Sequence, residues 1–109
     1  MSNFKDDLLA EAAGQTIEAI CIGDMGWSDF NHEHIPNWKE VPRGKLLNWQ
    51  EAAPLLDFNY STGYGAPECP CVYAWTKDYV IFISQYDGST CTNKVPRNPC
   101  DCDPQMPGG

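Results

Sequence analysis

Three β-rich segments that follow one another closely constrain the fold of this chain more than any other feature. They are "CVYAWT" (71–76), "YVIFISQY" (79–86) and "STCTNKV" (89–95), all rich in β-branched and aromatic residues. Lys77-Asp78 separates the first two segments and Asp87-Gly88 the last two. Asp-Gly is a strong hairpin signal because the tight turn requires positive φ. The sequence therefore predicts an antiparallel three-stranded meander.

The middle segment is largely apolar on both faces. Alternation places Val80, Phe82, Ser84 and Tyr86 on one face and Tyr79, Ile81, Ile83 and Gln85 on the other. We therefore expect this strand to be covered on both sides, by a helix and by a partner layer.

Further elements are expected upstream. Residues 3–13 have the apolar spacing of a short helix, with Gly14 as its stop, and residues 15–23 alternate like a strand. Asn48, followed by Glu51, is typical of a helix start in residues 47–58, and Pro54 requires that helix to be short or bent.

Together these segments predict an α+β domain over residues 1–99, followed by a Cys/Pro/Gly-rich tail over 100–109. The sheet would hold the three-stranded meander and one N-terminal strand, beside two short helices. Residues 24–45 show no clean period and mix turn formers with Trp27, Phe30 and Trp38. A loop this long is either functional or contains a short strand or turn.

Charge narrows the function classes. The formal net charge is -8, with 15 acidic and seven basic residues and no basic run. Direct nucleic-acid binding is not expected, because it requires clustered Lys and Arg. An acidic face that meets a basic partner is one interpretation, and many aromatic residues in a small chain favour a ligand-binding surface or a homo-oligomer.

The N-terminal segment has acids in its first turn and lacks a long apolar stretch, so we expect neither a signal peptide nor a membrane span. This favours a cytoplasmic protein with reduced thiols. Two C-x-C pairs, Cys69/Cys71 and Cys100/Cys102, flank the meander. They leave three possibilities open: free thiols, a disulfide between the pairs, or a four-thiolate zinc site.

Catalytic patterns are not found. His32 and His34 lie beside Glu33 and Asp29, an arrangement for metal or acid–base chemistry, but an exposed loop is the better interpretation because nothing else in the sequence supports a site. The sequence has neither a nucleophile elbow nor a zinc-protease motif. We expect a protein that is not an enzyme and needs no cofactor.

The segment after the meander suggests a ligand. Arg97 is flanked by Pro96, Asn98 and Pro99, so its guanidinium is presented from a stiff segment and suits a carboxylate or a phosphate. Asn98 adds an amide that can pair with an adenine edge. With Trp75, Phe82 and Tyr86 these residues form a candidate nucleotide site. The alternative is an internal salt bridge from Arg97 to Asp57 or Asp87.

Residues 48–99 carry a resemblance. The "GYGAP" turn, the "YAWT" strand, the "YDGST" hairpin and "VPRNP" resemble small proteins encoded by bacteriophages. Among these, the chain is similar to the Thoeris anti-defence sponges, which sequester cyclic ADP-ribose signals in oligomeric pockets. The resemblance implies non-catalytic sequestration of a small cyclic nucleotide in an infected host, with Phe82, Asn98 and Arg97 as the ligand-binding types.

Two other functions stay open. The first is an anti-CRISPR-like inhibitor whose acidic face covers a basic groove on a host nuclease. The second is a small zinc-stabilised structural protein.

Overall fold

A computed structural model describes residues 1–26 and 32–107. The elements run in the order β1 (Ser2–Asn3), α1 (Phe4–Ala12), β2 (Ala19–Met25), η1 (a 3₁₀ helix, Trp38–Glu40), β3 (Leu46–Asn48), α2 (Trp49–Ala52), η2 (a 3₁₀ helix, Ala53–Leu56), β4 (Asn59–Tyr60), β5 (Pro70–Trp75), β6 (Tyr79–Tyr86) and β7 (Ser89–Pro96). Trp27, Asp29 and Phe30, which the sequence placed in a functional or compact loop, lie outside the described residues.

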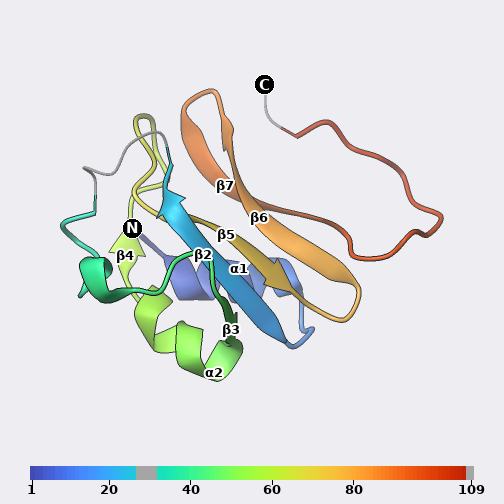
Figure 1. Cartoon of the computed structure of the whole chain (residues 1–109). Helices are drawn as coiled ribbons and strands as arrows, with labels where there is room; N and C mark the ends of the chain where they lie inside the picture. The colour runs from blue at the N-terminus through green and yellow to red at the C-terminus, as the bar shows by residue number, and fades with distance from the viewer. Residues whose placement is uncertain (27–31, 108–109) are drawn as a thin grey trace.

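The α+β class is confirmed, but the expected number of strands is wrong. The strands form a five-stranded antiparallel sheet in the order β3-β2-β5-β6-β7 and a separate two-stranded sheet of β1 and β4 (Figure 1). From the sequence we expected only four strands in the main sheet, which correspond to β2, β5, β6 and β7. β3 has three residues, and β1 and β4 have two each, so all three strands are too short to give a periodic pattern in the sequence.

The meander forms as predicted. β6 and β7 pair from Tyr79–Pro96 to Tyr86–Ser89, and the turn residues Asp87 and Gly88 have φ of 48° and 85°. Positive φ at both central residues matches the twist of the hairpin, which explains the Asp-Gly pair at this place.

Both helices begin at asparagine caps. Asn3 accepts a hydrogen bond from the backbone N–H of Asp6 at 3.0 Å, and Asn48 accepts one from Glu51 at 2.8 Å. The cap predicted at Asn48 is therefore confirmed. The helix after it has only four residues and continues as η2, because Pro54 stands at the start of that 3₁₀ turn.

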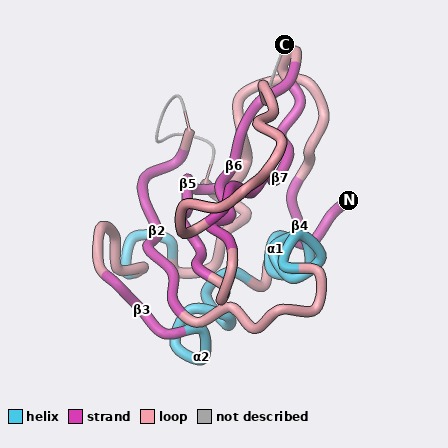
Figure 2. Tube along the Cα trace, turned by 90° about the vertical axis from the view of Figure 1, so that its right-hand side faces the viewer, coloured by secondary structure: helices cyan, strands magenta, loops and turns pink. Residues whose placement is uncertain are grey.

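One hydrophobic core lies between the sheet and α1. Phe4 and Leu8 on α1 pack toward Ile20 on β2 and Ile81 on β6, and all four side chains are fully buried. In Figure 1 α1 lies behind the sheet, and in the view turned by 90° it stands to one side of the strands (Figure 2). No helix of the described part is long and apolar enough to cross a membrane.

The expectation that β6 is covered on both faces is corrected in one respect. α1 covers the face of Ile81, whereas Phe82 and Val80 on the opposite face stay half-buried. Within residues 1–26 and 32–107, no helix and no second sheet packs on that face. The reason is length: the helices are short, and α1 and α2 both contribute to the same buried core.

Candidate functional site

The uncovered side of the main sheet, here called the outer face, is where the candidate site lies. The strand registers place its members opposite one another. The outer face comprises Ala19, Cys21 and Gly23 of β2, Leu46 and Asn48 of β3, Cys71, Tyr73 and Trp75 of β5, Val80, Phe82, Ser84 and Tyr86 of β6, and Ser89, Cys91, Asn93 and Val95 of β7.

A hollow of about 450 Å³ opens on the outer face beside β5 and β6. The two strands pair at only three positions, from Tyr73–Phe82 to Trp75–Val80, although β6 is eight residues long. Beyond Tyr73 the β6–β7 hairpin leans away from β5 (Figure 1), which leaves space between the strands. We call this space the β5–β6 hollow.

Glycines enlarge the β5–β6 hollow. Gly23 lies across from Cys71, so a Cβ at position 23 would stand 3.6 Å from the Cys71 Cβ. Gly44 adds a second position without a side chain, and its N–H donates to the carbonyl of Ile22 at 2.8 Å. At these two positions the hollow is therefore lined by backbone alone.

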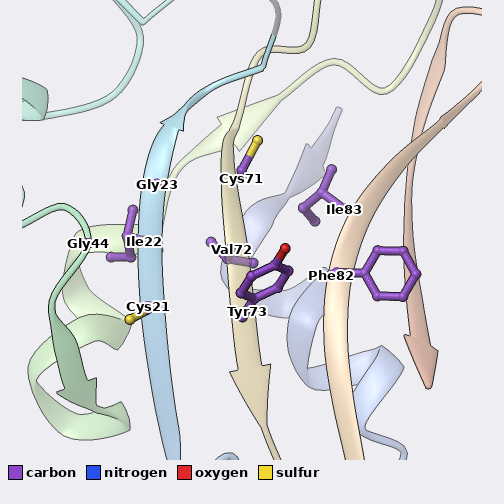
Figure 3. A pocket seen from close by; sticks show the side chains of 9 residues that line it. All are labelled: Cys21, Ile22, Gly23, Gly44, Cys71, Val72, Tyr73, Phe82 and Ile83. Atoms are coloured by element: carbon purple, nitrogen blue, oxygen red, sulfur yellow. The ribbon is translucent and has the colours of Figure 1, made fainter. Parts of the chain in front are cut away.

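One aromatic ring stands at the hollow. Tyr73 projects from β5 in front of the sheet, whereas the Phe82 ring projects from β6 toward β7, away from the space between β5 and β6 (Figure 3). Tyr73 is 60% exposed, and its ring meets that of Trp75 edge to face, with 6.4 Å between centroids. None of the nine lining residues is charged: Cys21, Ile22, Gly23, Gly44, Cys71, Val72, Tyr73, Phe82 and Ile83. Such a site suits a flat, uncharged ring.

Arg97 lies at one end of the outer face and is already paired. Its Nη1 donates to Oε1 of Glu18 at 2.7 Å and to the carbonyl of Thr76 at 2.9 Å. Its backbone N–H donates to the carbonyl of Asp78 at 2.8 Å, so the register of β6 and β7 continues through Arg97. The internal salt bridge considered from the sequence exists, with Glu18 as its partner and not Asp57 or Asp87.

The remaining predicted ligand residues are distributed over the sheet. Trp75 lies on the outer face between Arg97 and Tyr73, and Tyr86 lies at the hairpin end, 58% exposed. Asn98 lines a different hollow of about 310 Å³, together with Tyr79, Cys100 and Cys102. Phe82, Trp75 and Tyr86 thus share the outer face, Arg97 lies at one end of it, and Asn98 is turned to another cavity.

The four cysteines of the C-x-C pairs do not converge. Cys69 is 1% exposed, and burial, followed by the nearby Cys71 thiol, raises its pKa to about 12. Cys71 is exposed on the outer face, while Cys100 and Cys102 are exposed in the tail. Among the described residues, no three His, Cys, Asp or Glu side chains are grouped to hold a metal ion.

The histidines have local partners. His34 Nε2 lies 2.6 Å from the carbonyl oxygen of Glu68, and its ring packs on the edge of Phe58. His32 stacks at an angle on Trp38, with 6.4 Å between centroids. Asp29, the third member of that predicted cluster, lies outside the described residues.

Tyr73, Cys21 and both glycines of the β5–β6 hollow were not predicted as site residues from the sequence. Alternation in "CVYAWT" could have placed Cys71, Tyr73 and Trp75 on one face. The position of Gly44 has no local signal, because it depends on the loop returning to β2.

No protein-family model, no curated protein and no solved structure matches this chain.

Proposed function

We propose that the protein binds and sequesters a small nucleotide without transforming it, as a bacteriophage counter-defence protein acting in the cytoplasm of an infected host. The observation that carries the proposal is the uncharged β5–β6 hollow beside the Tyr73 ring, with Arg97 at one end of the same face. Its volume of about 450 Å³ lies in the range of small-molecule sites.

The nucleobase would occupy the hollow, against the ring of Tyr73. Base–aromatic stacking stabilises a bound base by about 1–3 kcal/mol for each ring contact. It needs no charged partner, which agrees with the uncharged lining.

The phosphate would lie toward Arg97. Arg97 lies opposite Asp78, the residue before β6, because its backbone N–H donates to the Asp78 carbonyl. Asp78 is four residues from Phe82, which corresponds to about 13 Å at the rise of a strand. That span suits a dinucleotide or a cyclic nucleotide better than a single nucleobase. A phosphate that reaches Arg97 must compete with the Glu18 carboxylate, so part of the binding free energy is lost to that exchange.

Isothermal titration calorimetry with adenosine, AMP and cyclic ADP-ribose tests the proposal. We expect cyclic ADP-ribose, the largest of the three ligands, to bind most tightly and to be recovered unchanged. Tyr73→Ala should weaken its binding by about 5- to 160-fold, the range that corresponds to one lost stacking contact.

Tyr64→Ala is the matched control. Tyr64 is 80% exposed, and its hydroxyl donates to Asp87 at the hairpin tip instead of lining the hollow. This variant should bind like the parent protein. Equal binding by the parent protein and Tyr73→Ala, or no binding of any nucleotide, would overturn the proposal.

A further inference from the structure

The strand residues of the outer face include no charged side chain, although the chain has 15 acidic and seven basic residues. The nearest charges stand at its two ends as ion pairs. Arg97 pairs with Glu18 at one end, and Arg43 pairs with Asp24 at 3.4 Å at the other. The strongly acidic character of the protein therefore belongs to its other surfaces.

Large apolar side chains protrude from this uncharged face. Leu46 on β3 is 64% exposed and Val95 on β7 is 47% exposed, and these strands form the two opposite edges of the sheet. Tyr73 stands between them, 60% exposed. Beside Val95 the C-terminal tail borders the same face, where Asp103 and Gln105 help to line a hollow of about 250 Å³. Exposed apolar side chains thus stand at both edges and in the middle of the sheet, beyond the β5–β6 hollow, and mark an interaction surface.

The absence of charge selects the occupant. A basic protein would be matched by carboxylates on the contact face, and a nucleic acid by Lys and Arg, and neither is present on the outer face. The face that best complements an uncharged apolar sheet is another of the same kind. Two sheets pack face to face about 10 Å apart, with their side chains interdigitated.

The size of the face agrees with such a contact. Five strands about 4.8 Å apart and six residues of about 3.3 Å give a flat footprint of roughly 500 Å². The side chains that stand on it add accessible surface to that footprint. The buried area is then of the order of the roughly 800 Å² per partner found in stable interfaces.

We propose that a second copy of this chain covers the outer face, so that two sheets form a sandwich related by a two-fold axis. The second sheet would close the β5–β6 hollow from above, so a ligand held there would be enclosed between two copies. The dimer itself rests on the outer face and does not depend on the nature of any ligand.

Sedimentation velocity of the full chain without ligand, over a concentration series, tests the proposal. We expect a dimer at micromolar concentration. Leu46→Glu and Val95→Glu should each weaken dimerisation at least about hundredfold, because each places two unpaired carboxylates in the apolar contact. Both side chains are exposed in the single copy, so circular dichroism should show an unchanged fold.

Leu9→Glu is the matched control. Leu9 is 40% exposed on α1, on the side away from the outer face, so this variant should dimerise like the parent protein. Added salt should tighten the dimer, because it screens the repulsion between two chains of net charge -8. A complex with a basic partner would respond in the opposite direction.

A parent protein that stays monomeric, or a dimer unaffected by both glutamates, would overturn the inference. A dimer disrupted equally by Leu9→Glu would also overturn it, because association would then use the helix side. Calorimetry on monomeric Leu46→Glu separates this question from the proposed function: nucleotide binding by that monomer supports the ligand site even where dimerisation fails.

Discussion

Arg97 donates a hydrogen bond of 2.7 Å from Nη1 to Oε1 of Glu18, which joins the end of β7 to the segment before β2 although β5 and β6 lie between these strands. The two residues are 79 positions apart in the sequence. From the sequence we expected the Arg97 guanidinium to bind a ligand. In the structure the Glu18 carboxylate holds it, so any anionic ligand must displace that carboxylate.

Glu18→Gln should release Arg97 from this competition. We expect tighter binding of cyclic ADP-ribose, together with a small loss of about 0.5 kcal/mol in the free energy of unfolding, since the ion pair is half exposed. Calorimetry and urea denaturation measure the two effects. Asp24→Asn, which breaks the ion pair with Arg43 at the other end, should leave the affinity unchanged. Unaltered affinity in Glu18→Gln would mean that Arg97 has only a structural role.

Substitutions on the two faces of the main sheet should differ strongly in their effect on the free energy of unfolding. Ile81→Ala removes a fully buried side chain of the central strand and should lower the free energy of unfolding by about 2–5 kcal/mol. Val95→Ala, on the outer face, should change it by less than about 0.5 kcal/mol when measured at a concentration that keeps the protein monomeric. Similar losses at both positions would show that the single chain has a layer on each face of its sheet.

Asn3→Ala should destabilise the N-terminus of α1. It removes the hydrogen bond that Asn3 accepts from Asp6, which costs about 1 kcal/mol of folding free energy, and also the hydrogen bond that Asn3 donates to Asp57. Chemical denaturation measures the loss. Asn98→Ala, at an exposed position beyond β7, is the comparison and should change stability by less than about 0.5 kcal/mol. Equal effects at the two positions would contradict the role of Asn3 as a cap.

Asp57 should make stability depend on pH in the acid range. Its pKa lies below the ordinary value of 3.8, first because Asn3 donates a hydrogen bond to it and second because of the positive charge of Lys5. A lowered folded-state pKa stabilises the protein above about pH 3.8, and the contribution is lost as pH falls through the folded-state pKa.

Urea denaturation between neutral pH and about pH 2.5 checks this sign. The loss of stability on acidification should be smaller in Asp57→Asn than in the parent protein, because this variant has no carboxyl to protonate. An identical acid dependence in both proteins would show that Asp57 makes no such contribution.

Cys69 and Cys71 should differ in reactivity although one residue separates them. Cys69 is buried with a pKa of about 12, whereas Cys71 is exposed, so alkylation of Cys69 should be at least about hundredfold slower. Timed labelling with iodoacetamide, followed by fragment mass spectrometry, separates the two positions. In denaturant their rates should become equal. Comparable rates in the folded protein would mean that Cys69 is accessible.

Local chemistry in the sequence determined the meander and the asparagine cap of the second helix. Asp87-Gly88 specified a turn with two positive φ values, and strict alternation along β6 separated Ile81 from Phe82. Asn48 and Glu51 specified a helix start, and Pro54 limited its length. These features depend on a few neighbouring residues, so they are visible before any tertiary contact forms.

Tertiary structure decided which face of the sheet is covered, where the strands separate and which group holds Arg97. α1 packs on the side of Ile81 and leaves Phe82 half-buried, although both faces of β6 are apolar in sequence. The β5–β6 hollow arises because the pairing of these strands stops after three positions, and Gly23 and Gly44 reach it from separate segments. Such outcomes depend on contacts between residues far apart along the chain, which periodicity and turn chemistry do not encode.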